Sequence, residues 1–322
     1  MKRRQFIGTA FGALAAGVVA AGERNALGAV GKSKLDAAAY RKERRYADLM
    51  FGKIAYVERG SGSVALFLHG FPLNSFQWRG AIERLASHRR CIAPDFMGLG
   101  YTQIPDGQSC IPDAQASMLA DLLDSLGIVD VDLVANDSGG AVAQLFVTRY
   151  PKRVRTLLLT NCDVEPDSPP PALEPVLELS REGKFADQWL APWLTDKALA
   201  RSAKGIGGMT FSDPMQPTDE AIEYYFSPLL GSARKKAQLH AYAMGLSPNP
   251  LAGIEPALKK CAVPTRILWG TADDIFSKDS PAYLDRTMGN SRGVRRIEGA
   301  KLFWPEEHPD IVAEEARRLW GV

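Results

Sequence analysis

The sequence predicts one α/β domain, in which helices flank a mostly parallel central sheet and a helical cap is inserted late in the chain. After the first thirty residues, apolar runs rich in β-branched residues alternate with helical patterns, which is typical of a parallel sheet covered on both faces. From about residue 161 five prolines interrupt this alternation, helical patterns follow, and strand character returns near residue 265. We therefore expect the core over residues 31–160 and 256–322, and the cap over 161–255.

Local patterns assign the individual elements. Short apolar runs bounded by turn residues predict strands, and apolar residues three and four positions apart predict helices. The predicted strands cover residues 54–58, 64–69, 90–94, 131–135, 154–160, 265–269 and 294–297. The predicted helices cover residues 79–85, 112–126, 218–225, 234–244 and 309–319, with a further helical stretch rich in Trp and Leu around 189–194.

Composition limits the classes of partner. The 322 residues are 46% hydrophobic and 24% charged, which suits a globular protein with a large core. A net charge of +2 gives no reason to expect nucleic acid as a partner. The cysteines are widely spaced and form no C-x-x-C motif, so we expect free thiols and no metal site. The glycines form no dinucleotide fingerprint, so no cofactor is expected.

The N-terminus predicts export. The basic residues Lys2, Arg3 and Arg4 precede an Ala- and Gly-rich apolar stretch over residues 8–22, and no acidic residue occurs before Glu23. This pattern is similar to a twin-arginine signal, and the apolar run is shorter than the roughly 20 residues of a membrane span. We expect residues 1–30 to be a signal peptide and the mature protein to be periplasmic or secreted, without stable membrane association.

The most informative short segment is Ala135-Asn136-Asp137-Ser138-Gly139-Gly140, between an apolar run and a helical pattern. A strand, a sharp turn of small residues and a helix together present one side chain above a sheet as a nucleophile. Such a turn tolerates small residues two positions before and after its centre. A frame centred on Asp137 satisfies this condition, whereas one centred on Ser138 places the bulkier Asn136 there. We therefore predict Asp137 as the nucleophile, with a Ser138-dependent esterase as the lesser alternative.

A second loop is expected beside this turn. His69-Gly70-Phe71-Pro72 directly ends a predicted strand, at the edge of the sheet where the nucleophile turn also lies. The backbone N–H groups of Phe71 and Ser138 can then converge on one oxygen and stabilise developing negative charge. We expect His69 to shape this loop rather than to carry protons.

Several segments together resemble the haloalkane dehalogenase and epoxide hydrolase branch of the α/β-hydrolase family. They are the run Leu66-Phe67-Leu68-His69-Gly70-Phe71-Pro72, the pair Trp78-Arg79, the run Pro94-Asp95-Phe96-Met97-Gly98-Leu99-Gly100-Tyr101 and the Asp137 turn. The resemblance covers nearly all of residues 45–322 and is closest before Asn161. It implies an Asp that attacks carbon to form an ester, and a His-activated water that hydrolyses the ester.

The resemblance also implies an acid that orients the histidine. Trp269-Gly270-Thr271-Ala272-Asp273 matches the family's acid turn, so Asp273 is the predicted acid and Asp274 its neighbouring alternative. Some relatives place the acid after the preceding core strand, where this chain has Asn161, with Asp163 two residues further on. Asp163 is therefore an outside candidate.

The expected base is missing from its usual place. The family frame Gly-Ala-x-His-Phe reads Gly299-Ala300-Lys301-Leu302-Phe303 here, and leucine accepts no proton. Of the other histidines, His88 and His308 are expected at the surface. His240, on the predicted helix near the cap, is the candidate for a substitute base, against the alternative of a half-buried structural histidine.

Further departures concern the substrate. Family dehalogenases place Trp directly after the nucleophile and often Asn after the His-Gly pair, whereas this chain has Ser138 and Phe71, so dehalogenation is not supported. Epoxide opening would use tyrosine donors from the cap. Tyr224 and Tyr225 lie on one predicted helix, but adjacent residues do not share a helix face, and packing is the expected role of both.

The sequence therefore leaves two main readings. The first is an exported Asp-nucleophile hydrolase that acts on a small apolar substrate, an ester, an epoxide or an alkyl halide. The second is a catalytically degenerate binding protein that kept the pocket and lost the chemistry. The retained Asp137 and Asp273 favour the first reading, and Leu302 favours the second.

Overall fold

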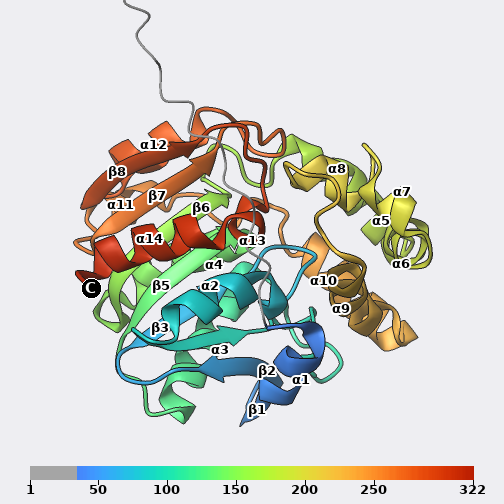
Figure 1. The fold of residues 1–322 in the computed structure, drawn as a ribbon, viewed down its shortest axis with the longest axis horizontal. Coiled ribbons are helices and arrows are strands. Elements are labelled where there is room, and N and C mark those ends of the chain that lie inside the picture. Colours follow the sequence, from blue (N-terminus) through green and yellow to red (C-terminus); the bar gives the residue numbers. More distant parts are fainter. Residues whose placement is uncertain (1–34) are drawn as a thin grey trace, which may run out of the picture. The chain divides into compact units, whose positions relative to one another are not determined.

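An eight-stranded sheet organises the protein. The structure, a computed structural model, describes residues 35–322, so the predicted signal peptide lies outside the described residues. The strand order is β1-β2-β4-β3-β5-β6-β7-β8. The first three strands in this order pair antiparallel and all the others pair parallel (Figure 1). The predicted mostly parallel sheet is thereby confirmed.

The bounds of the elements follow the sequence patterns closely. The strands are β1 (Arg44–Leu49), β2 (Gly52–Arg59), β3 (Val64–Leu68), β4 (Arg90–Pro94), β5 (Val131–Asp137), β6 (Val154–Cys162), β7 (Thr265–Gly270) and β8 (Ser291–Ile297). The core helices are α1 (Ala37–Glu43), α2 (Arg79–Leu85), α3 (Pro112–Ser125), α4 (Ser138–Arg149), α11 (Glu255–Lys259), α12 (Ser280–Thr287), α13 (Trp304–Glu307) and α14 (Pro309–Trp320). The short 3₁₀ turns η1 (Ser75–Trp78) and η2 (Pro151–Arg153) complete the core.

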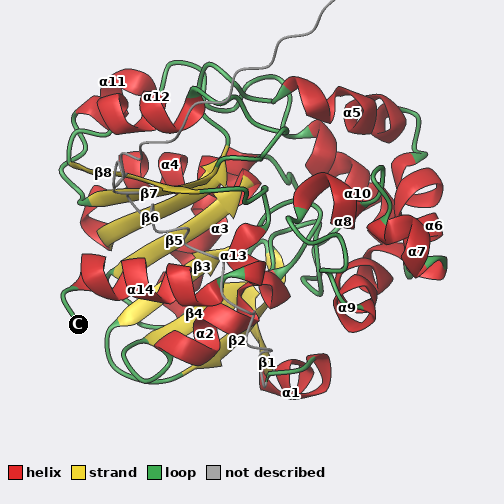
Figure 2. Cartoon of the chain, turned by 45° about the horizontal axis from the view of Figure 1, so that its top comes forward, coloured by secondary structure: helices red, strands yellow, loops and turns green. Residues whose placement is uncertain are grey.

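Helices cover both faces of the sheet. Helix α2 packs against α14, and α3 packs against α4, as two separate pairs (Figure 2). Every residue of the central strands β3 and β5 is buried, which explains why these strands read as unbroken apolar runs. The hydrophobic core therefore extends along the middle of the sheet.

The insertion between β6 and β7 is helical, as predicted. It contains η3 (Pro171–Leu173), α5 (Glu174–Arg181), the π-helix η4 (Ala186–Leu190), α6 (Ala191–Thr195), α7 (Lys197–Arg201), α8 (Ile206–Thr210), α9 (Asp219–Leu230) and α10 (Ala233–Met244). The stretch rich in Trp and Leu thus forms a π turn followed by a short α-helix. These helices lie together beside one end of the strands (Figure 1).

Several short elements were not predicted from the sequence: α1 and β1, the core helices α11, α12 and α13, and the cap helices α5, α7 and α8. Helix α1 spans only two turns, and β1 is an edge strand with one buried residue, so neither carries a strong apolar period. From Leu35 onward, no helix is long and apolar enough to span a membrane. All four cysteines are buried and free.

Candidate active site

The predicted nucleophile turn has the expected strained geometry. Strand β5 ends at Asp137 and α4 begins at Ser138, with Asp137 at φ 55° and ψ −134°. Among the described residues, Asp137 is the one non-glycine residue with positive φ. Strain of this kind persists only where surrounding structure imposes it, and it marks functional sites. Asp137, and not Ser138, therefore holds the strained central position.

The two glycines of the turn, Gly139 and Gly140, are required because neighbouring strands lie too close to leave room for a side chain. A Cβ atom on Gly139 would lie 2.6 Å from the carbonyl oxygen of His69. One on Gly140 would lie 2.3 Å from Cβ of Cys162. The small residues thus let α4 start against the ends of β3 and β6, which lifts Asp137 above the sheet edge.

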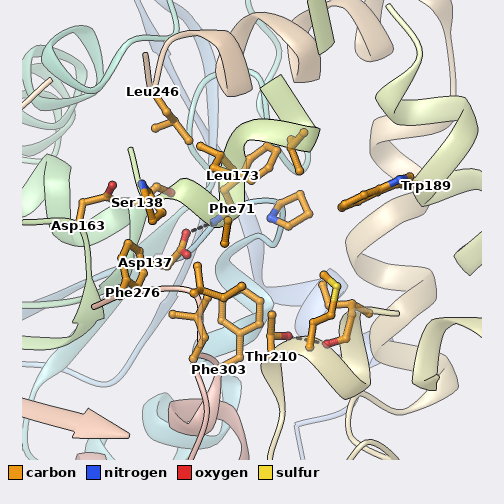
Figure 3. Close-up of a pocket in the computed structure, with 18 of the residues that line it drawn as sticks. Phe71, Asp137, Ser138, Asp163, Leu173, Trp189, Thr210, Leu246, Phe276 and Phe303 are labelled. Carbon is orange, nitrogen blue, oxygen red and sulfur yellow. Dashed lines mark hydrogen bonds between the residues drawn. The ribbon is translucent and has the colours of Figure 1, made fainter. Parts of the chain in front are cut away.

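Backbone donors hold the carboxylate of Asp137. The N–H of Phe71 donates to Oδ1 over 2.7 Å (Figure 3). Burial raises the pKa of Asp137 to about 6, and hydrogen bonding by the backbone of Ser138, the backbone of Phe71 and the Ser138 hydroxyl limits the rise. The donors that the sequence predicted for an oxyanion thus meet at one carboxylate, which stays ionised above about pH 6.

The Ser138 hydroxyl is engaged with the cap. Its Oγ lies 3.0 Å from Oη of Tyr242 on α10, and the Tyr242 ring stacks on Phe71 at 5.6 Å between centroids. Tyr242 was not predicted as a site residue. The available signal was its place two residues after His240: residues two apart on a helix face different ways, so Tyr242 can face the site when His240 does not.

An apolar cavity of about 220 Å³ lies over Asp137. Its walls combine core loops with cap helices, and aromatic and aliphatic side chains dominate them. The lining residues include Phe71, Phe185, Trp189, Trp193, Phe276 and Phe303, as well as Leu173, Val176, Ile206, Leu246 and Leu302. Three polar side chains, Asp137, Ser138 and Asp163, lie together at one end (Figure 3). A substrate bound here would be small and largely apolar.

Asp273 lies just behind this end of the cavity. It follows β7, and its carboxylate accepts hydrogen bonds from Nδ2 of Asn161 over 2.8 Å and from the N–H of Ile275 over 2.9 Å. Burial raises the pKa of Asp273 to about 6. Asp273 is not among the residues that line the cavity, whereas Leu302 is, with 3% of its surface exposed. An apolar side chain thus stands where the family places the imidazole.

A buried amide network fixes the loops around the site, and sequence analysis did not foresee it. Nε2 of Gln77 donates to Oδ1 of Asn136 over 2.6 Å, and Nδ2 of Asn136 donates to the carbonyls of Asn161 and Leu302. Oδ1 of Asn161 accepts from the indole N–H of Trp304 over 2.9 Å. These bonds join the ends of β5 and β6 to the loop that carries Leu302, and every amide involved is buried.

His69 and His240 make hydrogen bonds that hold the backbone, and neither forms a hydrogen bond with Asp137. His69 shapes its loop, as expected: Nδ1 contacts the carbonyl of Gly70 at 2.9 Å, Nε2 accepts from the N–H of Phe96 at 3.0 Å, and burial lowers the pKa of His69. His240 accepts a hydrogen bond from the N–H of Ala186 at 3.2 Å and does not line the cavity. The candidate base His240 is therefore not brought to Asp137, because its helix turns it toward η4.

The remaining histidines and the two cap tyrosines also lie elsewhere. His88 is exposed, and His308 is half-buried rather than exposed as predicted. Tyr224 stacks on Phe76 at 4.4 Å between centroids, and Tyr225 donates to Glu306 over 2.7 Å. None of these four side chains lines the cavity, and the two tyrosines pack as expected.

Asp163, the outside candidate for an acid, does line the cavity. It is 4% exposed, and its Oδ1 accepts a hydrogen bond from the hydroxyl of Ser168 over 2.9 Å. Burial, followed by the nearby charge of Asp137, raises the pKa of Asp163 to about 7. The structure thus brings two carboxyl groups, Asp137 and Asp163, to one apolar cavity.

Comparison with known proteins agrees with this architecture. The profile described as "Alpha/beta hydrolase family" matches residues 65–315. Epoxide hydrolase 3 of Mus musculus is 28% identical over 281 residues, which are 81% of this chain and 71% of that protein. A cis-3-alkyl-4-alkyloxetan-2-one decarboxylase of Shewanella oneidensis is 28% identical over 256 residues, 73% of this chain and 75% of that protein.

A haloalkane dehalogenase and an esterase of known structure are also similar to this chain. A haloalkane dehalogenase of Mesorhizobium japonicum is 42% identical over 113 residues, 35% of this chain and 36% of that protein. The solved structure of a thermophilic esterase from Thermogutta terrifontis superposes with a TM-score of 0.69 at 25% identity, covering 86% of this chain and 98% of that one. The predicted kinship with epoxide hydrolases and dehalogenases is therefore confirmed as a distant one.

Proposed function

Because the chain belongs to the α/β-hydrolase family, we propose that it is a hydrolase with Asp137 as its nucleophile, acting on a small apolar substrate that carries an electrophilic carbon. One observation carries the proposal: the strained turn holds the Asp137 carboxylate at the polar end of an apolar cavity. There the N–H of Phe71 binds Oδ1 over 2.7 Å.

The geometry divides the work between the two oxygens of Asp137. Oδ1 is held by Phe71, so the other oxygen is the one available to attack carbon and form an alkyl ester. When water then adds to the ester carbonyl, negative charge develops on the oxygen that faces the N–H groups of Phe71 and Ser138. The same donors therefore serve both steps.

We propose epoxides as the preferred substrate class. Two relatives that match most of this chain are named for small oxygen-containing rings, an epoxide and an oxetan-2-one. The residues at the usual halide-donor positions are Phe71 and Ser138, whose side chains offer no N–H. Opening of an epoxide ring produces an alkoxide oxygen, which needs a proton, and releases no halide ion that would need N–H donors.

We further propose, from the signal-like pattern of residues 1–30, that the protein is exported.

A covalent trap tests the nucleophile. We expect styrene oxide to add its mass to the intact protein, with the label on the peptide that contains Asp137. A single turnover in ¹⁸O-labelled water should place ¹⁸O in the Asp137 carboxyl group, because water attacks the ester carbonyl. Asp137→Asn keeps the size of the side chain and should abolish both signals, whereas Ser138→Ala should keep both.

The competing reading is a binding protein, which Leu302 favours because it places no base beside the carboxylates. It predicts that styrene oxide and alkyl bromides raise the melting temperature, while no ester forms and no diol or alcohol appears. That combination would overturn the proposed hydrolase. Loss of the label in Ser138→Ala, but not in Asp137→Asn, would instead identify a serine enzyme.

A further inference from the structure

We propose that Asp163 is the proton carrier of this site, giving a proton to the oxygen that leaves the opened ring and taking one from the water that hydrolyses the ester. The inference rests on the proposed chemistry of Asp137. It assigns to a carboxyl group the task that a histidine would perform at position 302.

Sheet register brings the two carboxyl groups together. Strands β5 and β6 are parallel neighbours, and Asp137 pairs directly with Cys162. Asp163 follows Cys162 directly after the end of β6. Both carboxyl groups line the cavity, at the same end of it and next to Ser138 (Figure 3).

Asp163 has no cation to hold it ionised. The described residues 35–322 place no Lys, Arg or His within salt-bridge distance of its carboxyl group, and the hydroxyl of Ser168 is its one side-chain donor. An ionised carboxylate that is 4% exposed and faces apolar walls is costly. Its pKa of about 7, raised first by burial and then by Asp137, lets it both donate and accept a proton near neutral pH.

The other groups near the cavity are less suited to the task. Asp273 is bound by Asn161 and by the N–H of Ile275, and it lies outside the cavity lining. Burial and the nearby carboxylates raise the pKa of the Tyr242 hydroxyl, which pairs with Ser138. The hydroxyl of Ser168 holds Oδ1 of Asp163, which lines the cavity.

The two steps balance. Ionised Asp137 attacks the epoxide carbon, the C–O bond breaks, and the released oxygen takes the proton of neutral Asp163. Ionised Asp163 then accepts a proton from water as water adds to the ester carbonyl, and it returns that proton to the alcohol when the ester C–O bond breaks. Asp137 is left as the acid, and transfer of its proton to Asp163 restores the starting pair. The sum is epoxide plus water giving a diol.

Proton sharing between Asp137 and Asp163 should determine the pH dependence of kcat/KM. The ionisable groups around Asp163 are Asp137 at the β5 end, Cys162 and Asp167 on its own segment, and Tyr242 from α10. The active form carries one proton on the Asp137–Asp163 pair, so kcat/KM should peak between about pH 6 and 7 and fall on both sides.

The test compares Asp163→Asn with the wild type on styrene oxide and on 1-bromohexane. Bromide leaves without a proton, so 1-bromohexane should label Asp137 at the same rate in both proteins, slowly in each because Phe71 and Ser138 offer no side-chain N–H to the halide. The label should then persist in the variant, because ester hydrolysis falls by about 10²–10⁴-fold. Ester formation from styrene oxide should slow, and the alkaline limb of kcat/KM should disappear. Asp163→Glu should restore part of the turnover.

Asp167→Asn is the matched control. Asp167 lies on the same loop, binds the N–H of Ser277 and does not line the cavity, so Asp167→Asn should keep both steps. Because the charge of Asp167 also raises the pKa of Asp163, the alkaline limb of kcat/KM should only move to lower pH in this variant. Equal turnover in Asp163→Asn and wild type would overturn the inference. So would an equal slowing of labelling by both substrates, which indicates a structural role. Absence of any Asp137 label in the wild type would instead overturn the proposed function itself.

Discussion

The side-chain amide of Asn136 donates to the backbone carbonyl of Leu302 over 3.2 Å, and this bond ties the residue before the nucleophile to the position of the missing base. The bond depends on the backbone of residue 302 and not on its side chain. The loop is therefore held where an imidazole would be useful, although leucine occupies the place.

Leu302→His should therefore gain activity. The new imidazole would enter the cavity beside Asp137, with Asp273 close behind to orient it. We expect the Asp137 ester to be hydrolysed about 10²-fold faster or more, measured as the decay of the label. Leu302→Met keeps the volume without a base and should decay like the wild type. A histidine variant that folds but shows no faster decay would mean that residue 302 does not face the ester.

The nucleophile turn should tolerate no side chain at Gly139. An alanine Cβ there would meet backbone carbonyl oxygens at 2.6 and 2.7 Å, so either α4 or Asp137 must move. We expect Gly139→Ala to lower the free energy of unfolding by about 1–3 kcal/mol and to abolish labelling of Asp137. Gly231, with φ −67° and its nearest contact at 3.6 Å, is the control. Gly231→Ala should leave labelling intact, as denaturant titration and mass analysis can show.

His240→Ala separates a structural histidine from a catalytic one. His240 accepts from the buried N–H of Ala186, so its loss should cost about 1–3 kcal/mol of unfolding free energy. Turnover by the folded variant should equal that of the wild type, because His240 does not line the cavity. Accumulation of the Asp137 ester in this variant would contradict the structure and restore His240 as the base.

Stability should depend on pH through Asp163. Its pKa in the folded protein is about 7, above the ordinary 3.8, so its contribution to stability is fully present below about pH 4 and is lost as pH rises through 7. Asp163→Asn cannot ionise. The variant should therefore have the higher melting temperature at pH 8, and the difference should shrink toward pH 4.5. A difference that does not change with pH would show that Asp163 is not forced to ionise in a buried place.

Local patterns in the sequence determined most of the fold. Strand β4 and helix α2 have the predicted bounds, because a buried strand and an amphipathic helix each leave a periodic signature over a few residues. The Asp137 turn was equally predictable, since the small residues that its strained backbone requires are neighbours in the chain. The helical insertion was visible where prolines interrupted the strand pattern.

Tertiary structure alone decided how the site is completed. The sequence offered Asp163, Asp273 and His240 as partners for Asp137 without ranking them by distance. The register of β5 and β6 places Asp163 at the cavity, and a hydrogen bond from Asn161 holds Asp273 outside the cavity lining. The orientation of α10 directs His240 to the N–H of Ala186 and Tyr242 to the hydroxyl of Ser138. Register and helix rotation depend on contacts between residues far apart in the chain, so the nucleophile can be predicted from neighbours and its partners cannot.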